Sequence, residues 1–334
     1  MPSHPITALL ARAASAREAL VDARHETAFR LFNGFLEGFA DLAIDLYAAT
    51  AVLHDYADPP GRGAAAVDAA CLFLRAQLPW VNAAVLKARH GTTAAERNGR
   101  LVFGSATDRR VREHGVWYAV DLCMNRDASL YLDTRHLREW AIGHLGGKSV
   151  LNTFAYTGSL GVAALAGGAV RVVQLDLNRR FLDFAKASCA LNGFAVNPRD
   201  FLAADFYTTV SRMKSRNERF DCVFLDPPFF AETRRGRIDL ESGGARLINK
   251  VRPLVRDGGY LVAVNNALFT SGREYMTALE TLCADGYLRV EELVPVPADS
   301  MGYPGTRIGN PITDPAPFNH ATKIAVLSVR RKAP

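Results

Sequence analysis

The tetrapeptide Asp226-Pro227-Pro228-Phe229 places a carboxylate, two prolines and an aromatic ring directly after the apolar run 220–225. The prolines remove backbone donors and stiffen the turn, so the Asp226 carboxylate and the Pro227 carbonyl are held in place. Such an acceptor pair can bind both hydrogens of a planar amine and orient its lone pair, while Phe229 stacks on the attached ring. The tetrapeptide predicts a site for chemistry on a planar amine, and the alternative is a rigid turn without chemistry.

Three earlier turns also follow apolar strands, and ligands of doubly wound sheets bind beyond the carboxyl ends of strands. The first turn is Asn152-Thr153-Phe154-Ala155-Tyr156-Thr157-Gly158, in which the glycine permits close approach of a ligand to the backbone. Asp176, followed by Leu177, ends the next strand, where a carboxylate can accept hydrogen bonds from ribose hydroxyls or cap the following helix. After the third strand, Asp205 could hold an adenine amine and Phe206 could cover the ring.

Strands and helices alternate regularly around these turns. The predicted strands are 150–154, 170–175, 200–204, 220–225 and 259–265, and the predicted helices are 160–166, 180–192, 207–216, 241–255 and 273–285. This order predicts an α/β, doubly wound, largely parallel sheet. The last strands, 288–296 and 323–330, are joined by a Gly/Pro-rich segment without a crossover helix, which predicts an antiparallel C-terminal hairpin. This arrangement resembles the Rossmann-like fold of class I methyltransferases.

The preceding residues predict a separate, small α/β domain over 1–107, with the cofactor domain over 108–334. Its predicted elements are a helix at 7–22, strands at 27–32, 40–55 and 81–87, a helix at 64–78 and a loop at 91–99. Beyond it, strands are predicted at 116–124 and 130–132, and a helix at 134–145. The small domain is a candidate substrate-binding domain.

Composition excludes several classes of protein. The chain has 334 residues, 49% of them hydrophobic, and its longest apolar stretches fall short of the roughly 20 residues that span a bilayer. Its five cysteines are far apart, which argues against a zinc site or a disulfide framework and predicts a cytoplasmic, reducing location. Acidic residues among the arginines of 1–24 favour an amphipathic helix over a transit peptide. The net charge of +6 is compatible with a nucleic-acid partner.

Taken together, these motifs resemble bacterial methyltransferases of large-subunit ribosomal RNA, comprising 5-methylcytosine enzymes and guanine-N-methylating relatives. The resemblance also includes Tyr131-Leu132-Asp133-x-Arg135, Thr27-x-Phe29-Arg30-Leu31 and Asp45-x-Tyr47. It implies S-adenosylmethionine as cofactor, held by the 152–158 loop, Asp176, Asp205 and Asp226, with Leu132 and Arg135 at its border. It also implies an RNA partner. We expect no counterpart here of the PUA RNA-binding domain that is usual in that family, because the resemblance begins with the family's central domain.

One departure from this family indicates which atom is methylated. Methylation of cytosine carbon 5 requires a cysteine thiolate, which in the family's cytosine enzymes follows the fifth strand. Here that strand ends in Asn265-Asn266, as in the guanine-N-methylating relatives, so we expect methylation of a base nitrogen. Three arginines after the tetrapeptide, Arg234, Arg235 and Arg237, form either a phosphate clamp for RNA or a solvated loop.

Other functions remain open at this stage. An Asp-Pro-Pro-aromatic turn also suits methylation of a small molecule or a protein amide, and an inactive RNA-binding relative would keep the same fold. A nicotinamide dehydrogenase is disfavoured because the G-x-G-x-x-G fingerprint is missing. The sequence leaves both a monomer and a homodimer open.

Overall fold

The protein divides into two compact units in the computed structural model, which describes residues 4–233 and 236–331. The first unit contains the residues up to Asp133 together with Pro297–Asn310, and the second contains Thr134–Val296 and the residues from Pro311 onward. The sequence placed one boundary after residue 107. In the structure, residues 108–133 and the distant segment Pro297–Asn310 also belong to the first unit.

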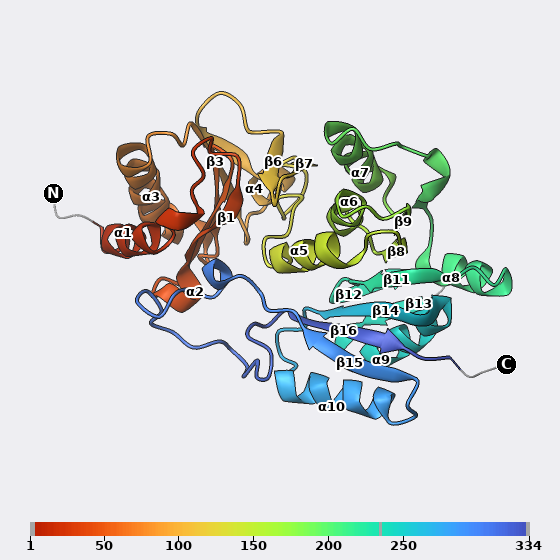
Figure 1. Ribbon diagram of the computed structural model, residues 1–334. Helices are drawn as coiled ribbons and strands as arrows, with labels where there is room; N and C mark the ends of the chain where they lie inside the picture. Colours follow the sequence, from red (N-terminus) through yellow and green to blue (C-terminus); the bar gives the residue numbers. More distant parts are fainter. Residues whose placement is uncertain (1–3, 234–235, 332–334) are drawn as a thin grey trace. The chain divides into compact units, whose positions relative to one another are not determined.

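A five-stranded sheet forms the centre of the first unit (Figure 1). Its strands, in spatial order, are β1 (Ala28–Asn33), β2 (Leu42–Tyr47), β3 (Thr50–Asp55), β4 (Ala83–Ala88) and β5 (Arg100–Phe103). The helices of this unit are α1 (Ile6–Ala16), α2 (Gly34–Glu37), α3 (Ala64–Gln77) and α4 (Ala94–Asn98). Apolar side chains of α1 and α3, such as Leu10 and Leu74, form one core with alternate residues of the sheet, such as Ile44.

The polar segment 91–99, expected to be a loop, contains the short helix α4. Thr93 accepts a hydrogen bond from the Glu96 backbone, and Glu96 bonds back to Thr93 in a capping box. The predicted strand at 130–132 is also wrong, because these residues lie in irregular chain. The Leu130 carbonyl instead accepts a hydrogen bond of 2.9 Å from the Tyr47 hydroxyl, which fixes this stretch on the first unit.

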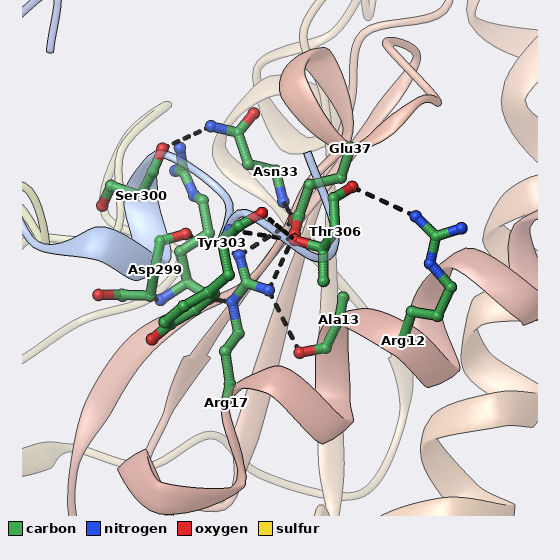
Figure 2. Close-up of polar contacts among 10 residues, drawn as sticks. Arg12, Ala13, Arg17, Asn33, Glu37, Asp299, Ser300, Tyr303 and Thr306 are labelled. Atoms are coloured by element: carbon green, nitrogen blue, oxygen red, sulfur yellow. Dashed lines mark hydrogen bonds and ion pairs between the residues drawn. The ribbon is translucent and has the colours of Figure 1, made fainter. Parts of the chain in front are cut away.

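A long-range polar cluster attaches Pro297–Asn310 to the rest of the first unit (Figure 2). The fully buried Arg17 guanidinium forms a two-bonded ion pair with Glu37, 3.0 Å for each bond, and donates to the Asp299 carbonyl at 2.8 Å. Glu37 also accepts a hydrogen bond from the Thr306 hydroxyl. Because each charge is surrounded by partners, the ion pair can remain buried, and it holds together segments that are far apart in sequence.

This cluster yields a stability prediction. Replacing Arg17 by Met leaves the Glu37 carboxylate buried without its counter-charge, and we expect a loss of about 3–5 kcal/mol in the free energy of unfolding. The matched control is Arg62→Met, which removes an exposed partner of Asp41 and should change stability by about 0–1 kcal/mol. Urea unfolding followed by circular dichroism measures both. Equal, small effects of the two replacements would contradict the structural role of Arg17.

The second unit contains a seven-stranded sheet with the order β10-β9-β8-β11-β14-β16-β15. Its strands are β8 (Ser149–Thr153), β9 (Arg171–Asp176), β10 (Phe201–Ala203), β11 (Phe220–Leu225), β14 (Val255–Asn265), β15 (Leu288–Leu293) and β16 (Lys323–Val329). The neighbouring strands from β10 through β9, β8 and β11 to β14 all pair in parallel. In contrast, β16 is antiparallel to both β14 and β15. The predicted parallel sheet with an antiparallel C-terminal hairpin is confirmed.

Helices cover both faces of this sheet (Figure 1). They are α5 (Arg135–His144), α6 (Ser159–Ala166), α7 (Arg179–Leu191), α8 (Phe206–Ser215), α9 (Leu240–Val251) and α10 (Gly272–Cys283). Alternate strand residues enter two cores: Val150 and Phe224 pack with α5 and α6, whereas Leu151 and Leu225 pack with α8, α9 and α10. Burial of both faces explains why the strands are almost continuously apolar.

Two further hairpins escaped the sequence-based prediction. They are β6 (Arg110–Glu113) with β7 (Val116–Ala119) in the first unit, and β12 (Phe230–Thr233) with β13 (Gly236–Asp239) in the second. β7 lies within the strand predicted at 116–124, whereas β6, β12 and β13 are only four residues long and show no clear apolar alternation.

Candidate cofactor and active site

The parallel strands of the second unit bring their carboxyl ends to one edge. Thr153 of β8 is in register with Leu175 of β9 on one side and with Leu225 of β11 on the other. The chain after β8 continues to β9, whereas β11 returns to the opposite side of β8, so the strand order reverses between β8 and β11. The loop after β8 and the turn after β11 therefore lie at the topological switch point, where doubly wound sheets bind ligands.

The loop after β8 has an unusual backbone. Phe154 and Tyr156 have φ values of 55° and 50°, and Gly158 has 76°. Left-handed conformations cost non-glycine residues free energy and are enriched at ligand-binding sites. At Gly158 a β-carbon would lie only 2.4 Å from the Ala185 β-carbon, so this position has room for glycine alone. The loop is thus held close to α7.

The buried Gln174, in the neighbouring strand β9, holds this loop by hydrogen bonds. Its Nε2 donates to the Gly158 carbonyl at 3.1 Å, and its Oε1 accepts from Asn152 Nδ2 at 2.8 Å. The remaining side-chain acceptor of Asn152, Oδ1, is buried without a hydrogen-bond partner. Sequence reasoning missed Gln174, although a glutamine within the apolar strand Arg171–Asp176 was an available signal.

The Asp176 carboxylate is held by backbone groups at the end of β9. Its Oδ2 accepts from Tyr156 N and its Oδ1 from Asn178 N, each at 2.8 Å. Burial raises the pKa of Asp176, although these two hydrogen bonds act to lower it. Each oxygen keeps acceptor capacity for a ribose hydroxyl. The alternative reading as a helix cap is wrong, because Asn178 caps α7.

Leu177, directly after Asp176, is 67% exposed. A large apolar side chain kept in solvent beside a half-buried carboxylate can cover the face of an aromatic ring. Asp205 caps α8: its Oδ1 accepts from Thr208 N at 2.9 Å. Phe206 is buried in the core and packs against Phe154, with ring centroids 4.5 Å apart. The expected adenine contacts of Asp205 and Phe206 stay predictions.

The exposure of the side chains differs along the turn after β11. Pro227 is buried, whereas Pro228 and Phe229 are exposed, the latter by 41%. The Phe229 carbonyl accepts a hydrogen bond of 3.1 Å from Leu240 N at the start of α9. The backbone of the turn is therefore anchored, while the aromatic ring remains available at the switch point.

Beyond β14, Asn265 and Asn266 differ in environment. Asn265 is buried, and its Oδ1 accepts from Ala267 N at 2.9 Å, so it shapes the turn. Oδ1 of Asn266 is a buried acceptor without a partner. Lys323 supports the turn by donating from Nζ to the Ala267 carbonyl at 2.9 Å, and burial lowers the pKa of Lys323 to about 8. Sequence reasoning missed this lysine at the start of β16.

The other predicted site residues are placed as follows. Leu132 is buried in the first unit, and Arg135 begins α5 of the second. Thr153 is buried and donates from its hydroxyl to the Phe224 carbonyl at 2.7 Å, so it ties β8 to β11. Arg234 and Arg235 lie outside the described residues, and the side chain of Arg237 does too. Over 4–233 and 236–331, His, Cys, Asp and Glu form no group of three able to hold a metal ion.

None of the described helices is long and apolar enough to cross a membrane.

Comparison with known proteins identifies the class. Residues 94–297 match the S-adenosylmethionine-dependent methyltransferase family, so the chain belongs to that family, and its cofactor is S-adenosylmethionine. Among solved structures, SMU.776, provisionally described as a methyltransferase and complexed with SAH, has a TM-score of 0.83 at 21% identity, covering 97% of this chain and 80% of that chain. This likeness confirms the predicted fold.

Two relatives are similar in sequence. The Bacillus subtilis (strain 168) protein YwbD, provisionally named as a ribosomal RNA large subunit methyltransferase, is 30% identical over 77% of this chain and 65% of its own length. Ribosomal RNA large subunit methyltransferase K/L of Shewanella pealeana is 29% identical over 71% of this chain and 34% of its own length. The chain thus spans less than two thirds of either relative.

The switch-point residues fit this cofactor. The unpartnered Asn152 Oδ1 and the crowded Gly158 supply a polar, narrow cradle, and Asp176 with Leu177 offers acceptors beside an exposed apolar face. A sulfonium cofactor carrying an adenosine needs these features: acceptors for a charged amino acid and a ribose, and apolar cover for a base.

Gly158→Ala should weaken S-adenosylhomocysteine binding by tenfold or more, because the added β-carbon clashes with Ala185 and displaces the loop. The matched control is Gly193→Ala, whose φ is +69° but whose added β-carbon meets nothing within 4 Å, so it carries the backbone cost alone, about 1–2 kcal/mol of stability. Titration calorimetry with each variant measures the affinities. Equal affinity of Gly158→Ala and the wild type would contradict the cradle.

Proposed function

We propose that this protein transfers the methyl group of S-adenosylmethionine to a nitrogen of an RNA base, with guanine of ribosomal RNA as the favoured target and the cytoplasm as the location. The observation that carries the proposal is the position of the Asp226 turn, across the switch point from the loop after β8. The names of the relatives support ribosomal RNA as the substrate.

The bound cofactor supplies a methyl group already activated on a sulfonium. The remaining task of the protein is to hold and orient the acceptor nitrogen, and correct positioning can account for much of the rate. In the proposed role, Asp226 and the Pro227 carbonyl accept hydrogen bonds from the amine and so direct its lone pair. The exposed Phe229 ring stacks on the base, and its anchored backbone limits movement of the turn.

The cysteines support a nitrogen target over cytosine carbon 5. Attack on carbon 6 requires a thiolate, which forms readily only where the thiol pKa is lowered. Here burial raises the pKa of each of the five free cysteines, to about 11 for Cys71 and Cys189. Cys222, within β11, is fully buried in the core. A route that needs no thiolate fits these thiols better.

Asp226→Asn tests the proposed acceptor. We expect methyl transfer to RNA to fall by about 100-fold, because the amide replaces a carboxylate oxygen by a donor and misorients the amine. Binding of S-adenosylhomocysteine should stay within threefold of the wild type. The control is Asp183→Asn, an exposed acid of α7 paired with Lys186, which should leave both unchanged. Undiminished transfer by Asp226→Asn would remove the turn from the mechanism.

Replacing each cysteine by alanine tests the target atom. All five single variants should retain methyl transfer within about threefold of the wild type, because no thiolate takes part. Radiolabelled transfer to total RNA, followed by mass spectrometry of the nucleosides, gives both rate and position. A 5-methylcytosine product that disappears in one of the variants would overturn the assignment to nitrogen.

A parallel assay with labelled cofactor compares RNA, protein and metabolite extracts as acceptors. Label in RNA supports the proposal, and label confined to protein or metabolites contradicts it. Mass spectrometry of ribosomal RNA from a strain lacking the protein then locates the missing methyl group.

A further inference from the structure

A cavity of about 550 Å³ lies between α9 and α10, beside the end of β14. Its walls include the apolar side chains of Leu240, Ile248 and Leu282, and its lining also includes Asn265, Phe269 and Glu274. The volume lies within the range of about 300–1,000 Å³ that is common for ligand pockets. The expected cofactor contacts at the 152–158 loop, Asp176 and Asp205 follow β8, β9 and β10, and Asp226 follows β11. None of these residues lines the cavity.

Exposed apolar side chains follow the carboxyl ends of β14 and of its neighbour β11. Phe269 is 69% exposed and its neighbour Leu268 is 50% exposed, directly after the turn that follows β14. Phe229 and Phe230 are exposed after the neighbouring strand β11, which pairs in parallel with β14. Four large exposed apolar side chains thus follow two neighbouring parallel strands, and exposed apolar side chains that gather in this way are typical of an interaction site.

The polar lining restricts the chemistry of an occupant. Glu274 Oε2 accepts hydrogen bonds from the Ser271 backbone N and hydroxyl, each at 2.7 Å. Within the described part of the chain, Oε1 of Glu274 has no hydrogen-bond partner. The carboxylate is thus oriented by one oxygen while the other can accept from a ligand donor. Apolar walls, an exposed ring and one fixed acceptor suit a flat ring that carries an amino group.

We propose that this cavity binds an unpaired nucleobase next to the target nucleotide, with Phe269 stacking on its face and Glu274 Oε1 accepting from its amino group. The inference rests on the proposed function, because an RNA strand whose target base lies at the Asp226 turn continues along the same edge past the end of β14. Adenine, cytosine and guanine carry the required amino group. Uracil lacks it, and its ring donor lies between two carbonyl oxygens that a carboxylate repels.

Short single-stranded RNAs test this directly. Fluorescence anisotropy of labelled decamers of adenosine, cytidine or uridine is measured with the full chain saturated with S-adenosylhomocysteine. We expect the wild type to bind the adenosine and cytidine decamers more tightly than the uridine decamer. Phe269→Ala should weaken binding of the adenosine decamer about tenfold, as expected for the loss of one stacked base. Glu274→Gln, which can keep the capping box with Ser271, should reduce the preference over uridine.

The control is Val170→Ala. Val170 is an equally exposed apolar residue directly before β9, so it lies at the amino ends of the parallel strands, away from the cavity. Its RNA affinity should match the wild type. With the RNA that the wild type methylates, Phe269→Ala should raise KM about tenfold with kcat within threefold. A fall in kcat at constant KM would assign the cavity to the target base and overturn the inference.

Two negative results have different meanings. Unchanged affinity and unchanged base preference in both cavity variants, with RNA methylation intact, would overturn the nucleobase site and leave the proposed function standing. A wild type that binds S-adenosylhomocysteine but neither binds nor methylates RNA would overturn the proposed function, and the nucleobase site with it.

Discussion

The parallel register of β9, β8, β11 and β14 is the constraint on which the candidate site depends. Parallel strands end at the same edge, so four turns that are distant in sequence meet there. The reversal of strand order between β8 and β11 then separates two tasks. Turns on one side, with Asp176 and the loop up to Gly158, are suited to hold an adenosine-containing cofactor. We propose that the turns on the other side, after β11 and β14, receive the substrate.

Backbone strain and close packing are concentrated in the loop after β8. The left-handed Phe154 and Tyr156 need a surrounding structure that outweighs their conformational cost. Gln174 provides part of it from the adjacent strand, and the close approach of Gly158 to Ala185 provides another part from α7. The loop is thus fixed by the sheet and a helix. Such preorganisation lowers the entropy that binding must overcome.

The first unit illustrates a different constraint, because it is built from two segments far apart in sequence. The Arg17–Glu37 ion pair and the Arg17 bond to the Asp299 carbonyl join its N-terminal residues to the excursion between β15 and β16. Closing so long a loop costs conformational entropy. A unit built from one continuous segment would avoid this cost. The buried charges make the closure specific, since any other register would leave one of them without its partner.

The sequence by itself determined the alternation of strands and helices in the second unit, the antiparallel hairpin, and the acidic residues Asp176, Asp205 and Asp226 at strand ends. These features are local, because apolar periodicity and turn residues act over a few positions. Tertiary structure decided the rest. That Gln174 supports Gly158, that Lys323 holds the turn at Ala267, and that residues 297–310 complete the first unit all depend on which segments become neighbours. Those contacts join residues far apart in sequence, so a local sequence pattern cannot predict them.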